Sequence, residues 1–314
     1  MKLVIGTRGS ELALAQSRWV QRQLLDDPGN GVDAVELEII KTRGDKILDV
    51  ALNKVGGKGL FVKELELALL DGAVDLAVHS MKDMPSELPD GLVLGPVPER
   101  EDPRDAWVRP EGEAPTLLAS LPHGATVGTS SLRRQAQLLA SRPDLIIVPV
   151  RGNVGTRLAK LDEGRDGMVA LVLACAGLRR LDLDERITHP FGVEAMLPAV
   201  GQGALALELR AGDARVATAL ERLEHPNTRW ATLAERTFLG ALEGGCQVPI
   251  GGHATVTDGV MRLRGYVSHT NGQQVLRHEV TGPALDAVRL GRELGDIMIA
   301  SGGAEILEAG RAEA

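Results

Sequence analysis

The chain has 314 residues, of which 44% are hydrophobic and 25% charged, as expected for a globular protein of two or three domains. Its net charge of −8 argues against general nucleic-acid binding, and its two cysteines cannot form a disulfide framework, which fits a reducing cytoplasm. The longest apolar run, Met168 to Leu178, is too short to cross a bilayer, and the chain shows no signal-peptide pattern. We therefore expect a cytoplasmic protein without nucleic-acid or membrane partners.

Segments typical of strands and helices alternate along most of the chain. The predicted strands are Lys2–Thr7, Val35–Thr42, Val74–His79, Thr126–Thr129, Leu145–Val150 and Val169–Cys175. The predicted helices are one that begins after Ser10, Leu60–Asp71, Ser131–Ser141, Val154–Glu163 and Ala214–Leu223. This alternation predicts α/β units with largely parallel sheets.

Domain boundaries are expected where proline, glycine and charge interrupt this alternation. Pro96–Asp105 and Leu197–Gly203 are predicted to be linkers, and His225-Pro226 opens a last portion with strand-like alternation. These boundaries give three domains: residues 1–99 with 203–222 (α/β, discontinuous), 104–198 (α/β) and 225–314 (small α+β).

A short internal repeat favours two similar α/β domains. Ile5-Gly-Thr-Arg-Gly-Ser and Val127-Gly-Thr-Ser-Ser both run from a strand through Gly-Thr into a helix capped by serine. Such helices would aim free N–H groups and positive dipole ends into a cleft. Because the repeat is so short, chance is also a fair explanation of it.

Cys246 lies in a loop of unusual composition. Gly244, Gly245, Gly251 and Gly252 frame it and allow close backbone approaches, and Pro249 follows it. The segment is typical of a loop that presents a thiol, but a free cysteine is often only a small buried hydrophobe. The other cysteine, Cys175, lies in an apolar strand and is expected to be in the core.

Many cations occupy Gly- or Ser-rich connections rather than helix faces. They are Arg8, Lys54, Lys58, Lys82, Arg133, Arg134, Arg151 and Arg157. Ligands of open α/β sheets bind beyond the carboxyl ends of strands, where these connections fall, and Arg and Lys are suited to carboxylates and phosphates. The set therefore predicts a polyanionic ligand, although each residue alone is better explained as solvated surface charge.

Asp83, between Lys82 and Pro85, is the acid of greatest interest. A carboxylate among cations stays ionised and can stabilise positive charge that develops on a substrate, but a turn residue before proline is an equal explanation. Asp45 allows the same two interpretations, and His79 is equally well explained as a packed histidine. No metal-ligand spacing appears, and Gly56-Gly-Lys-Gly lacks the spacing of a nucleotide P-loop.

Together these motifs closely resemble those of the porphobilinogen deaminase family. The matching segments are Thr7-Arg-Gly-Ser-Glu-Leu-Ala, Lys41-Thr-Arg-Gly-Asp, Gly56-Gly-Lys-Gly-Leu-Phe-Val-Lys-Glu-Leu, Ala77-Val-His-Ser-Met-Lys-Asp-Met-Pro, Arg100-Glu-Asp-Pro-Arg-Asp-Ala, Gly128-Thr-Ser-Ser-Leu-Arg-Arg, Arg151-Gly-Asn-Val-Gly-Thr-Arg-Leu, Leu197-Pro-Ala-Val-Gly-Gln-Gly-Ala and Leu242-Glu-Gly-Gly-Cys-Gln-Val-Pro-Ile-Gly. They occur in the family's order over about residues 4–253, and the last sixty residues match less distinctively.

The resemblance implies a fold and an activity. The fold would be two domains like type II periplasmic binding proteins, plus a small α+β domain that carries the cofactor cysteine. The activity would be a transferase that condenses four porphobilinogen molecules head-to-tail, with loss of ammonia, into hydroxymethylbilane for tetrapyrrole and heme biosynthesis. A monomer is expected. Stepwise growth of the product predicts hinge motion between the first two domains at Glu99–Asp105 and Pro198–Gln202.

The resemblance also assigns residues. One covalent dipyrromethane cofactor per chain would be held through a thioether to Cys246, and Asp83 would be the catalytic residue, contacting pyrrole N–H groups and stabilising cationic intermediates. The remaining cofactor-binding residues would be Lys82, Ser130, Arg133, Arg134, Thr129, Arg151 and Lys58. The substrate-binding residues would be Arg8, Ser10, Arg151, Arg157, Arg180, Lys54, Phe61 and Gln202.

Two other classes of protein stay open from the residues alone. A non-enzymatic solute-binding protein with an anion-binding cleft would explain the α/β domains and the arginine-rich turns, but not Cys246 in its glycine frame or Asp83. A phosphate-binding transferase with a free catalytic cysteine is a weaker alternative.

Overall fold

The computed structural model describes residues 1–42, 62–242 and 248–312. Several predicted site residues lie outside the described residues: Asp45, Lys54, Lys58, Phe61 and Cys246. The chain divides into two compact units. Unit 1 comprises Met1–Glu101 and Ala204–Arg229, and unit 2 comprises Asp102–Gly203 and Trp230–Ala314.

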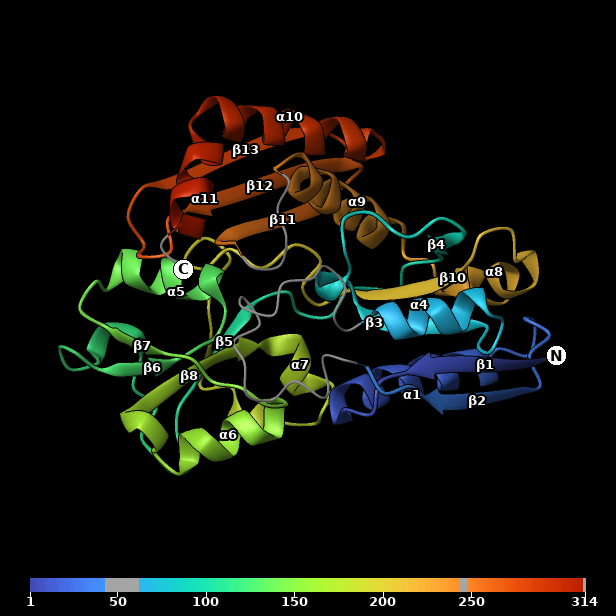
Figure 1. The fold of residues 1–314 in the computed structure, drawn as a ribbon, viewed down its shortest axis with the longest axis horizontal. Coiled ribbons are helices and arrows are strands. Elements are labelled where there is room, and N and C mark those ends of the chain that lie inside the picture. The colour runs from blue at the N-terminus through green and yellow to red at the C-terminus, as the bar shows by residue number, and fades with distance from the viewer. Residues whose placement is uncertain (43–61, 243–247, 313–314) are drawn as a thin grey trace. The chain divides into compact units, whose positions relative to one another are not determined.

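Unit 1 is built on a five-stranded mixed sheet with the order β2-β1-β3-β10-β4 (Figure 1). Its strands are β1 (Lys2–Thr7), β2 (Ala34–Ile39), β3 (Leu76–Ser80), β4 (Leu92–Leu94) and β10 (Leu205–Arg210). β1 is parallel to both β2 and β3, whereas β10 is antiparallel to β3 and β4. Its helices are α1 (Glu11–Leu25), α4 (Lys63–Leu70) and α8 (Ala214–Leu220).

The first sheet of unit 2 repeats this plan with the order β7-β6-β8-β5-β9. Its strands are β5 (Asp105–Val108), β6 (Thr126–Gly128), β7 (Ile146–Val148), β8 (Met168–Ala174) and β9 (His189–Pro190). β6 is parallel to β7 and β8, and β5 is antiparallel to β8 and β9. The helices that follow the parallel strands are α5 (Leu132–Ser141), α6 (Val154–Asp162) and α7 (Cys175–Arg179).

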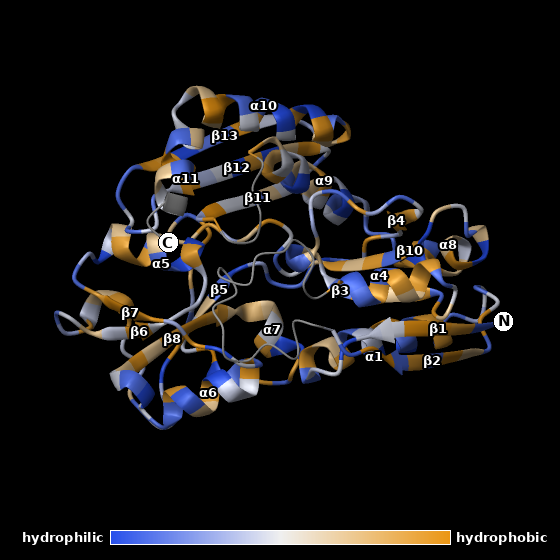
Figure 2. Cartoon of the chain, in the orientation of Figure 1, coloured by the Kyte–Doolittle hydropathy of each residue, from blue (hydrophilic) through white to orange (hydrophobic). Residues whose placement is uncertain are grey.

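The antiparallel strand is β10 in the first sheet and β5 in the second, and only β10 comes from a distant part of the chain. Along the chain, β10 comes after all the strands of the second sheet. β5 comes just after Met1–Glu101, the first segment of unit 1. The central strand of the second sheet, β8, is apolar along its whole length (Figure 2), as expected for a strand buried on both faces.

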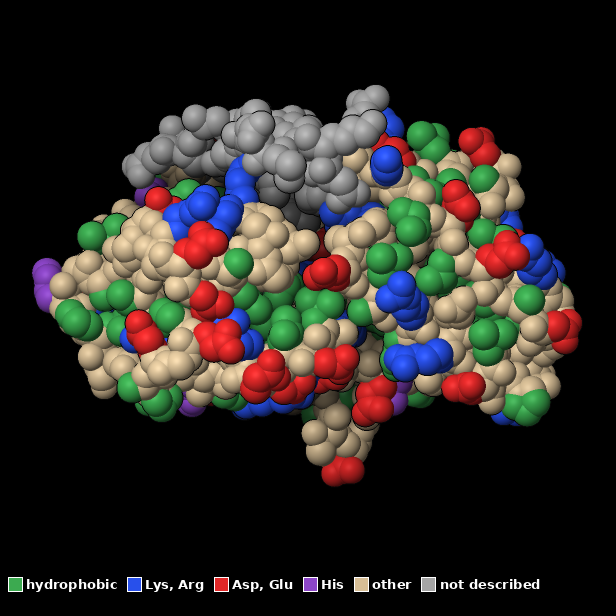
Figure 3. All heavy atoms as spheres, turned by 90° about the horizontal axis from the view of Figure 1, so that it is seen from below, with side chains coloured by type: hydrophobic (Ala, Val, Ile, Leu, Met, Phe, Trp, Pro, Cys, Tyr) green, Lys and Arg blue, Asp and Glu red, His purple; other side chains and the backbone are tan. Residues whose placement is uncertain are grey.

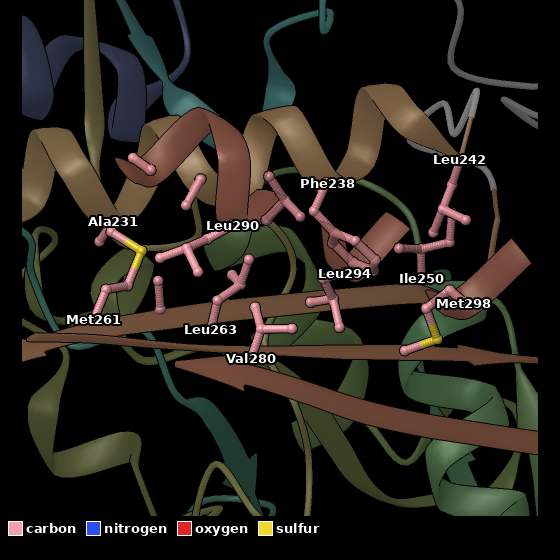
Figure 4. Packing of buried hydrophobic residues seen from close by; sticks show 14 of the residues in the cluster. Ala231, Phe238, Leu242, Ile250, Met261, Leu263, Val280, Leu290, Leu294 and Met298 are labelled. Atoms are coloured by element: carbon pink, nitrogen blue, oxygen red, sulfur yellow. The ribbon is translucent and has the colours of Figure 1, made fainter. Parts of the chain in front are cut away.

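The rest of unit 2 is a three-stranded antiparallel sheet with helices on one face. The strands β11 (Ile250–Thr257), β12 (Val260–Ser268) and β13 (Val275–Pro283) lie in sequence order. The helices of this region are α9 (Pro226–Ala241), α10 (Ala287–Ala300) and α11 (Gly303–Ala312). Figure 4 shows Phe238 of α9 and Leu294 of α10 pointing toward the sheet, and both are fully buried.

The structure confirms the predicted α/β class and the small C-terminal α+β region, and it corrects two details. Asp105 does not end a linker, because it is the first residue of β5 and is fully buried. Cys175 is in the core as predicted, but it is the first residue of α7 rather than the last of a strand. The two helices of the internal repeat are capped by serine as predicted, α1 by Ser10 and α5 by Ser131.

Gly272 joins the C-terminal region of unit 2 to helix α5. Its φ is +78°, and a Cβ there would lie 2.4 Å from the backbone nitrogen of Ala140 and 2.7 Å from the carbonyl oxygen of Ala136. We expect Gly272→Ala to lower the free energy of unfolding by about 3 kcal/mol, since strain at positive φ and a backbone clash add together. Gly124→Ala is the matched control, because its φ is +74° but nothing lies within 4 Å of its Cβ.

Urea unfolding of the two variants measures this difference. Gly124→Ala should lose only about 1 kcal/mol, the cost of the backbone strain alone. Equal losses for both variants would show that the Gly272 contact with α5 is not formed.

Candidate functional site

In unit 1 the predicted site residues follow two adjacent parallel strands. Because β1 and β3 are paired in parallel, their carboxyl ends meet at the same edge of the sheet. Arg8 directly follows β1, and Lys82 and Asp83 lie in a short 3₁₀ helix, Met81–Asp83, directly after β3. The structure therefore brings Arg8, Lys82 and Asp83 to one edge of this sheet.

The turn that carries Asp83 is anchored on both sides. Met81 and Met84 are each only 2% exposed, whereas Asp83 between them is exposed. The amide of Met84 donates to the carbonyl oxygen of Met81 (3.1 Å). The amide of Met81 donates to the carbonyl oxygen of Ala204 (3.0 Å). The backbone thus fixes where the Asp83 carboxylate is presented, and solvent or a ligand can reach it.

Ser10 begins helix α1 at the same edge. Its side-chain oxygen accepts from the amide of Ala13 (3.4 Å), and its backbone is extended, as is usual for an N-cap. One turn further along α1, Gln16 Nε2 donates to Ser80 Oγ (2.8 Å), which ties the helix to the end of β3. The N-terminus of α1 therefore adds free N–H groups beside Arg8.

A buried histidine–carboxylate pair lies in β3 and β10. His79 Nε2 is 3.0 Å from Glu208 Oε2, and both side chains are nearly inaccessible. The pKa of nearby Glu66 is raised by burial and further by the charge of Glu208. His79 is thus a packed histidine with a carboxylate partner.

In unit 2, hydroxyls and an arginine meet at the carboxyl ends of β6 and β7. The amide of Thr129 donates to the carbonyl oxygen of Val148 (2.9 Å), and Ser130 Oγ donates to that of Val150 (2.8 Å). Arg151 is the next residue, so Thr129, Ser130 and Arg151 lie at one edge of the second sheet.

Two helix N-termini point from this edge. Ser131 caps α5 by accepting from the amide of Arg134 (3.4 Å), and Asn153 caps α6 by accepting from the amide of Thr156 (2.8 Å). Arg157 lies in the first turns of α6, where its Nε donates to the carbonyl oxygen of Gly152 (2.8 Å). Two positive dipole ends and partly buried arginines make this edge suited to anions.

Arg133 and Arg134 are both buried and paired with Asp105, whereas Arg8, Arg151 and Arg157 are only partly buried. Arg133 Nη1 is 2.7 Å from Asp105 Oδ2, and Arg134 Nη2 is 2.7 Å from Asp105 Oδ1. Burial by itself would raise the pKa of the Asp105 carboxyl, but the two guanidinium groups outweigh it and lower this pKa far below its usual range.

Gln202 and Arg180 also bond within unit 2. Gln202 is 1% exposed, and its Nε2 donates to the carbonyl oxygen of Pro103 (2.7 Å) and to Asp105 Oδ1 (2.9 Å). Arg180 Nη2 donates to the carbonyl oxygen of Gly203 (2.7 Å). The described structure thus gives Gln202 buried partners, and its predicted contact with substrate stays a prediction.

Asp105 was not among the predicted site residues. The signal that could have found it is the acid that abuts Ala106-Trp107-Val108, an apolar run typical of a buried strand. A carboxylate next to such a run needs a cationic partner, and Arg133 and Arg134 are the partners that the structure provides.

Cys175 is chemically inert in the folded protein. Its side chain is fully buried, and burial, together with the charges of Asp102 and Asp105, raises the pKa of its thiol to about 12. Because the thiolate is the reactive form, we expect no alkylation of Cys175 by iodoacetamide at pH 8 in the native state and complete alkylation in urea. Peptide mapping by mass spectrometry measures both, and rapid native alkylation would contradict the burial.

One face of the molecule shows how charged side chains are distributed on the described surface. On the face shown in Figure 3, carboxylates and basic side chains are interspersed in each unit. No helix in the described part of the chain has the length and apolar character needed to span a bilayer. Among the described residues, no group of three or more His, Cys, Asp or Glu side chains could hold a metal ion.

Comparisons with known proteins cover nearly the whole chain. The family model "Porphobilinogen deaminase, dipyromethane cofactor binding domain" matches residues 3–218, and "Porphobilinogen deaminase, C-terminal domain" matches residues 230–300. Porphobilinogen deaminase of Moorella thermoacetica is 53% identical over 313 residues, covering 100% of this chain and 98% of that protein. The porphobilinogen deaminase of Nitratidesulfovibrio vulgaris (strain Miyazaki F) is 54% identical over 311 residues, covering 98% and 96%.

Two solved structures resemble the chain at a low level. The VFT2 domain of Bordetella pertussis BvgS is 16% identical with a TM-score of 0.40, over 73% of this chain and 89% of that chain. A probable extracellular-binding protein of an amino-acid ABC transporter from Bacillus subtilis is 10% identical with a TM-score of 0.41, over 71% and 90%. Neither similarity bears on function.

The fold and the strand-end residues define a class: an α/β protein with two five-stranded sheets that share one pattern of strand directions, and with helix N-termini, hydroxyls and basic side chains at the carboxyl ends of the parallel strands. The chain belongs to the porphobilinogen deaminase family, and residues 3–218 are its dipyrromethane cofactor-binding domain. The resemblance seen in the sequence motifs is confirmed.

Proposed function

We propose that this chain is a hydroxymethylbilane synthase, a transferase that joins four porphobilinogen molecules head-to-tail and releases ammonia at each addition. The observation that carries this proposal is sequence identity above 50% to porphobilinogen deaminases over the full length, with both family domains present in order. The alternative of a non-enzymatic solute-binding protein has only a distant fold resemblance in its favour.

The strand-end residues fit the charge of the ligand. Each porphobilinogen carries two carboxylates, so both the dipyrromethane cofactor and the growing product are polyanions. Hydroxyls, helix N-termini and arginines at the end of the second sheet are the donors that carboxylates require. An acidic protein can bind such a ligand because its cations are gathered locally.

The proposed cofactor contacts comprise a covalent link and a set of polar side chains. Cys246 would hold dipyrromethane through a thioether, and the bound cofactor supplies the terminal pyrrole carbon to which substrate is added. The polar contacts come from Asp83, Lys82, Lys58, Thr129, Ser130, Arg133, Arg134 and Arg151. The groups proposed for substrate are Arg8, Ser10, Lys54, Phe61, Arg151, Arg157, Arg180 and Gln202.

Asp83 is proposed as the catalytic residue. When the C–N bond of porphobilinogen breaks and ammonia leaves, positive charge develops on the substrate pyrrole. A fixed carboxylate beside the pyrrole N–H stabilises that charge, and the anchored Met81–Asp83 turn supplies such a carboxylate without rearrangement. The same carboxylate stabilises the positive charge that remains until the α-proton is lost after C–C bond formation.

We further propose the domain boundaries 1–99 with 203–222, 104–198 and 225–314. The separate apolar core under β11–β13 and the family domain matched at residues 230–300 support the third of these. A monomeric, cytoplasmic enzyme without nucleic-acid or membrane partners is proposed from the acidic net charge and the composition.

The direct assay is conversion of porphobilinogen by the purified protein. The proposal expects one ammonia released per porphobilinogen consumed and one hydroxymethylbilane formed per four. Binding of porphobilinogen without release of ammonia would favour the solute-binding alternative and overturn the enzyme.

A further inference from the structure

A buried polar cluster at the start of helix α5 joins three segments of unit 2. Its members are Asp105 of β5, Arg133 and Arg134 of α5, and Gln202 in the connection before β10, which are 0%, 4%, 6% and 1% exposed. Arg133 Nη1 and Nη2 donate to Asp105 Oδ2 (2.7 Å) and Oδ1 (3.2 Å), which is a bidentate pair. Arg134 Nε donates to Asp105 Oδ1 (2.8 Å), so one carboxylate orients both guanidinium groups.

Backbone carbonyls complete the cluster. Arg133 Nη1 donates to the carbonyl oxygen of Leu197 (2.8 Å), and Arg134 Nη1 donates to that of Val172 in β8 (3.0 Å). Gln202 Nε2 adds a further donor to Asp105 Oδ1 (2.9 Å). These contacts leave the two arginines little freedom to choose another rotamer.

The cluster keeps an excess of positive charge and an unused donor. Two arginines and one aspartate sum to a single positive charge, because an arginine stays protonated in a protein. Arg133 Nε is buried and has no hydrogen-bond partner among the described residues. Arg133 follows Ser130 by three residues and Thr129 by four, at the N-terminal end of α5 where free amides and the positive dipole end are found.

We propose that Asp105 is a positioning residue for anion binding at this helix end. It fixes Arg133 and Arg134 so that the unused Nε donor of Arg133 and the single net positive charge of the cluster act on a cofactor carboxylate near Thr129 and Ser130. Without the carboxylate, two buried guanidinium groups would repel each other and turn apart. This inference rests on the proposed function, because the anion is the dipyrromethane cofactor of that proposal.

The test compares Asp105→Asn with the control Asp144→Asn in the full-length enzyme. Asp144 also pairs with an arginine of unit 2 just beyond α5, since its Oδ2 is 2.7 Å from Arg142 Nη2, but at the opposite end from the cluster. We expect kcat of Asp105→Asn to fall about 100-fold, as a misplacement of the bound cofactor by about 1 Å would cause. KM for porphobilinogen should change less than about threefold, because the incoming substrate is proposed to bind other residues, and Asp144→Asn should match the wild type.

A double variant separates positioning from general destabilisation. If Asp105 acts through Arg134, the kcat of the double variant Asp105→Asn/Arg134→Lys should be no lower than the lower kcat of the two single variants. If the two residues acted independently, the fold-losses in kcat of the single variants would instead multiply in the double variant. Circular dichroism gives the folded fraction of each variant, and if Asp105→Asn does not fold, Asp105→Glu serves in its place, because it keeps the charge and shifts it by one methylene.

The outcomes are distinct. A folded Asp105→Asn enzyme with wild-type kcat, or multiplicative losses in the double variant, would overturn the positioning role while the wild type stays active. A wild type without a dipyrromethane adduct and without turnover would overturn the proposed function and this inference with it.

Discussion

Asp83→Ala is expected to lower turnover about 1,000-fold while leaving the fold and the dipyrromethane adduct intact. The size of the effect follows from the loss of a preorganised charge opposite a developing cation, which costs about 100- to 1,000-fold in comparable sites. The fold should survive because Asp83 is exposed and the buried anchors of its turn are Met81 and Met84. Steady-state kinetics with porphobilinogen and intact mass of the purified variant measure the two halves of this prediction.

The matched control for Asp83 is Asp90→Ala. Asp90 is an exposed acid in the same connection between β3 and β4, so its replacement removes the same charge from the same region. Its turnover should equal that of the wild type. An Asp83→Ala enzyme that keeps more than about a tenth of wild-type turnover would show that catalysis does not depend on this carboxylate.

Cys246→Ser is expected to abolish turnover. Without a sulfur to hold the cofactor, the enzyme has no fixed pyrrole to which substrate can be added, so the advantage of proximity is lost for every addition. The loss should exceed about 10,000-fold, since effective molarities of well-oriented intramolecular reactions are of this order or larger. Turnover assays with ample porphobilinogen measure it.

Cys175→Ala is the control for the cysteine variant. Cys175 is the other of the two cysteines and is buried in the core of unit 2, so its loss removes a thiol without touching the proposed site. The variant should turn over at the wild-type rate. Full activity in Cys246→Ser, or loss of activity only in Cys175→Ala, would show that the cofactor is not attached through Cys246.

The sequence predicts the local units well, because their determinants are local. Ser10 and Ser131 each precede an amphipathic helix and follow a Gly-Thr strand end, and both cap as predicted. Parallel pairing then brings Arg8 and Asp83 to one sheet edge, and Thr129 and Arg151 to another. Alternation of strands and helices is enough to expect this.

The sequence does not predict the interactions that depend on distant segments. β10 enters its sheet from far along the chain, and β5 directly follows a segment with several prolines and charges, so the local pattern predicts neither strand and assigns Asp105 to a linker. The pairing of Asp105 with Arg133 and Arg134 spans 28 and 29 residues and requires the fold to exist first. The burial of Gln202 has the same origin, since its partners are Pro103 and Asp105.

The distribution of charge explains how an acidic chain could bind the proposed polyanionic ligand. The net charge is −8, and both signs are interspersed on the face shown in Figure 3, whereas the strand ends combine helix N-termini with cations. Asp105 partly neutralises the positive charge at the second of these ends, because together with Arg133 and Arg134 it leaves a single net positive charge. Local arrangement, rather than total charge, therefore decides what the protein binds.

The intact mass of the purified wild-type protein tests the central claim most directly. The account predicts that protein expressed with ample porphobilinogen is heavier than its sequence by two linked pyrroles, and that this increment is present in Cys175→Ala and absent in Cys246→Ser. A wild-type mass equal to that of the bare 314-residue chain would contradict it.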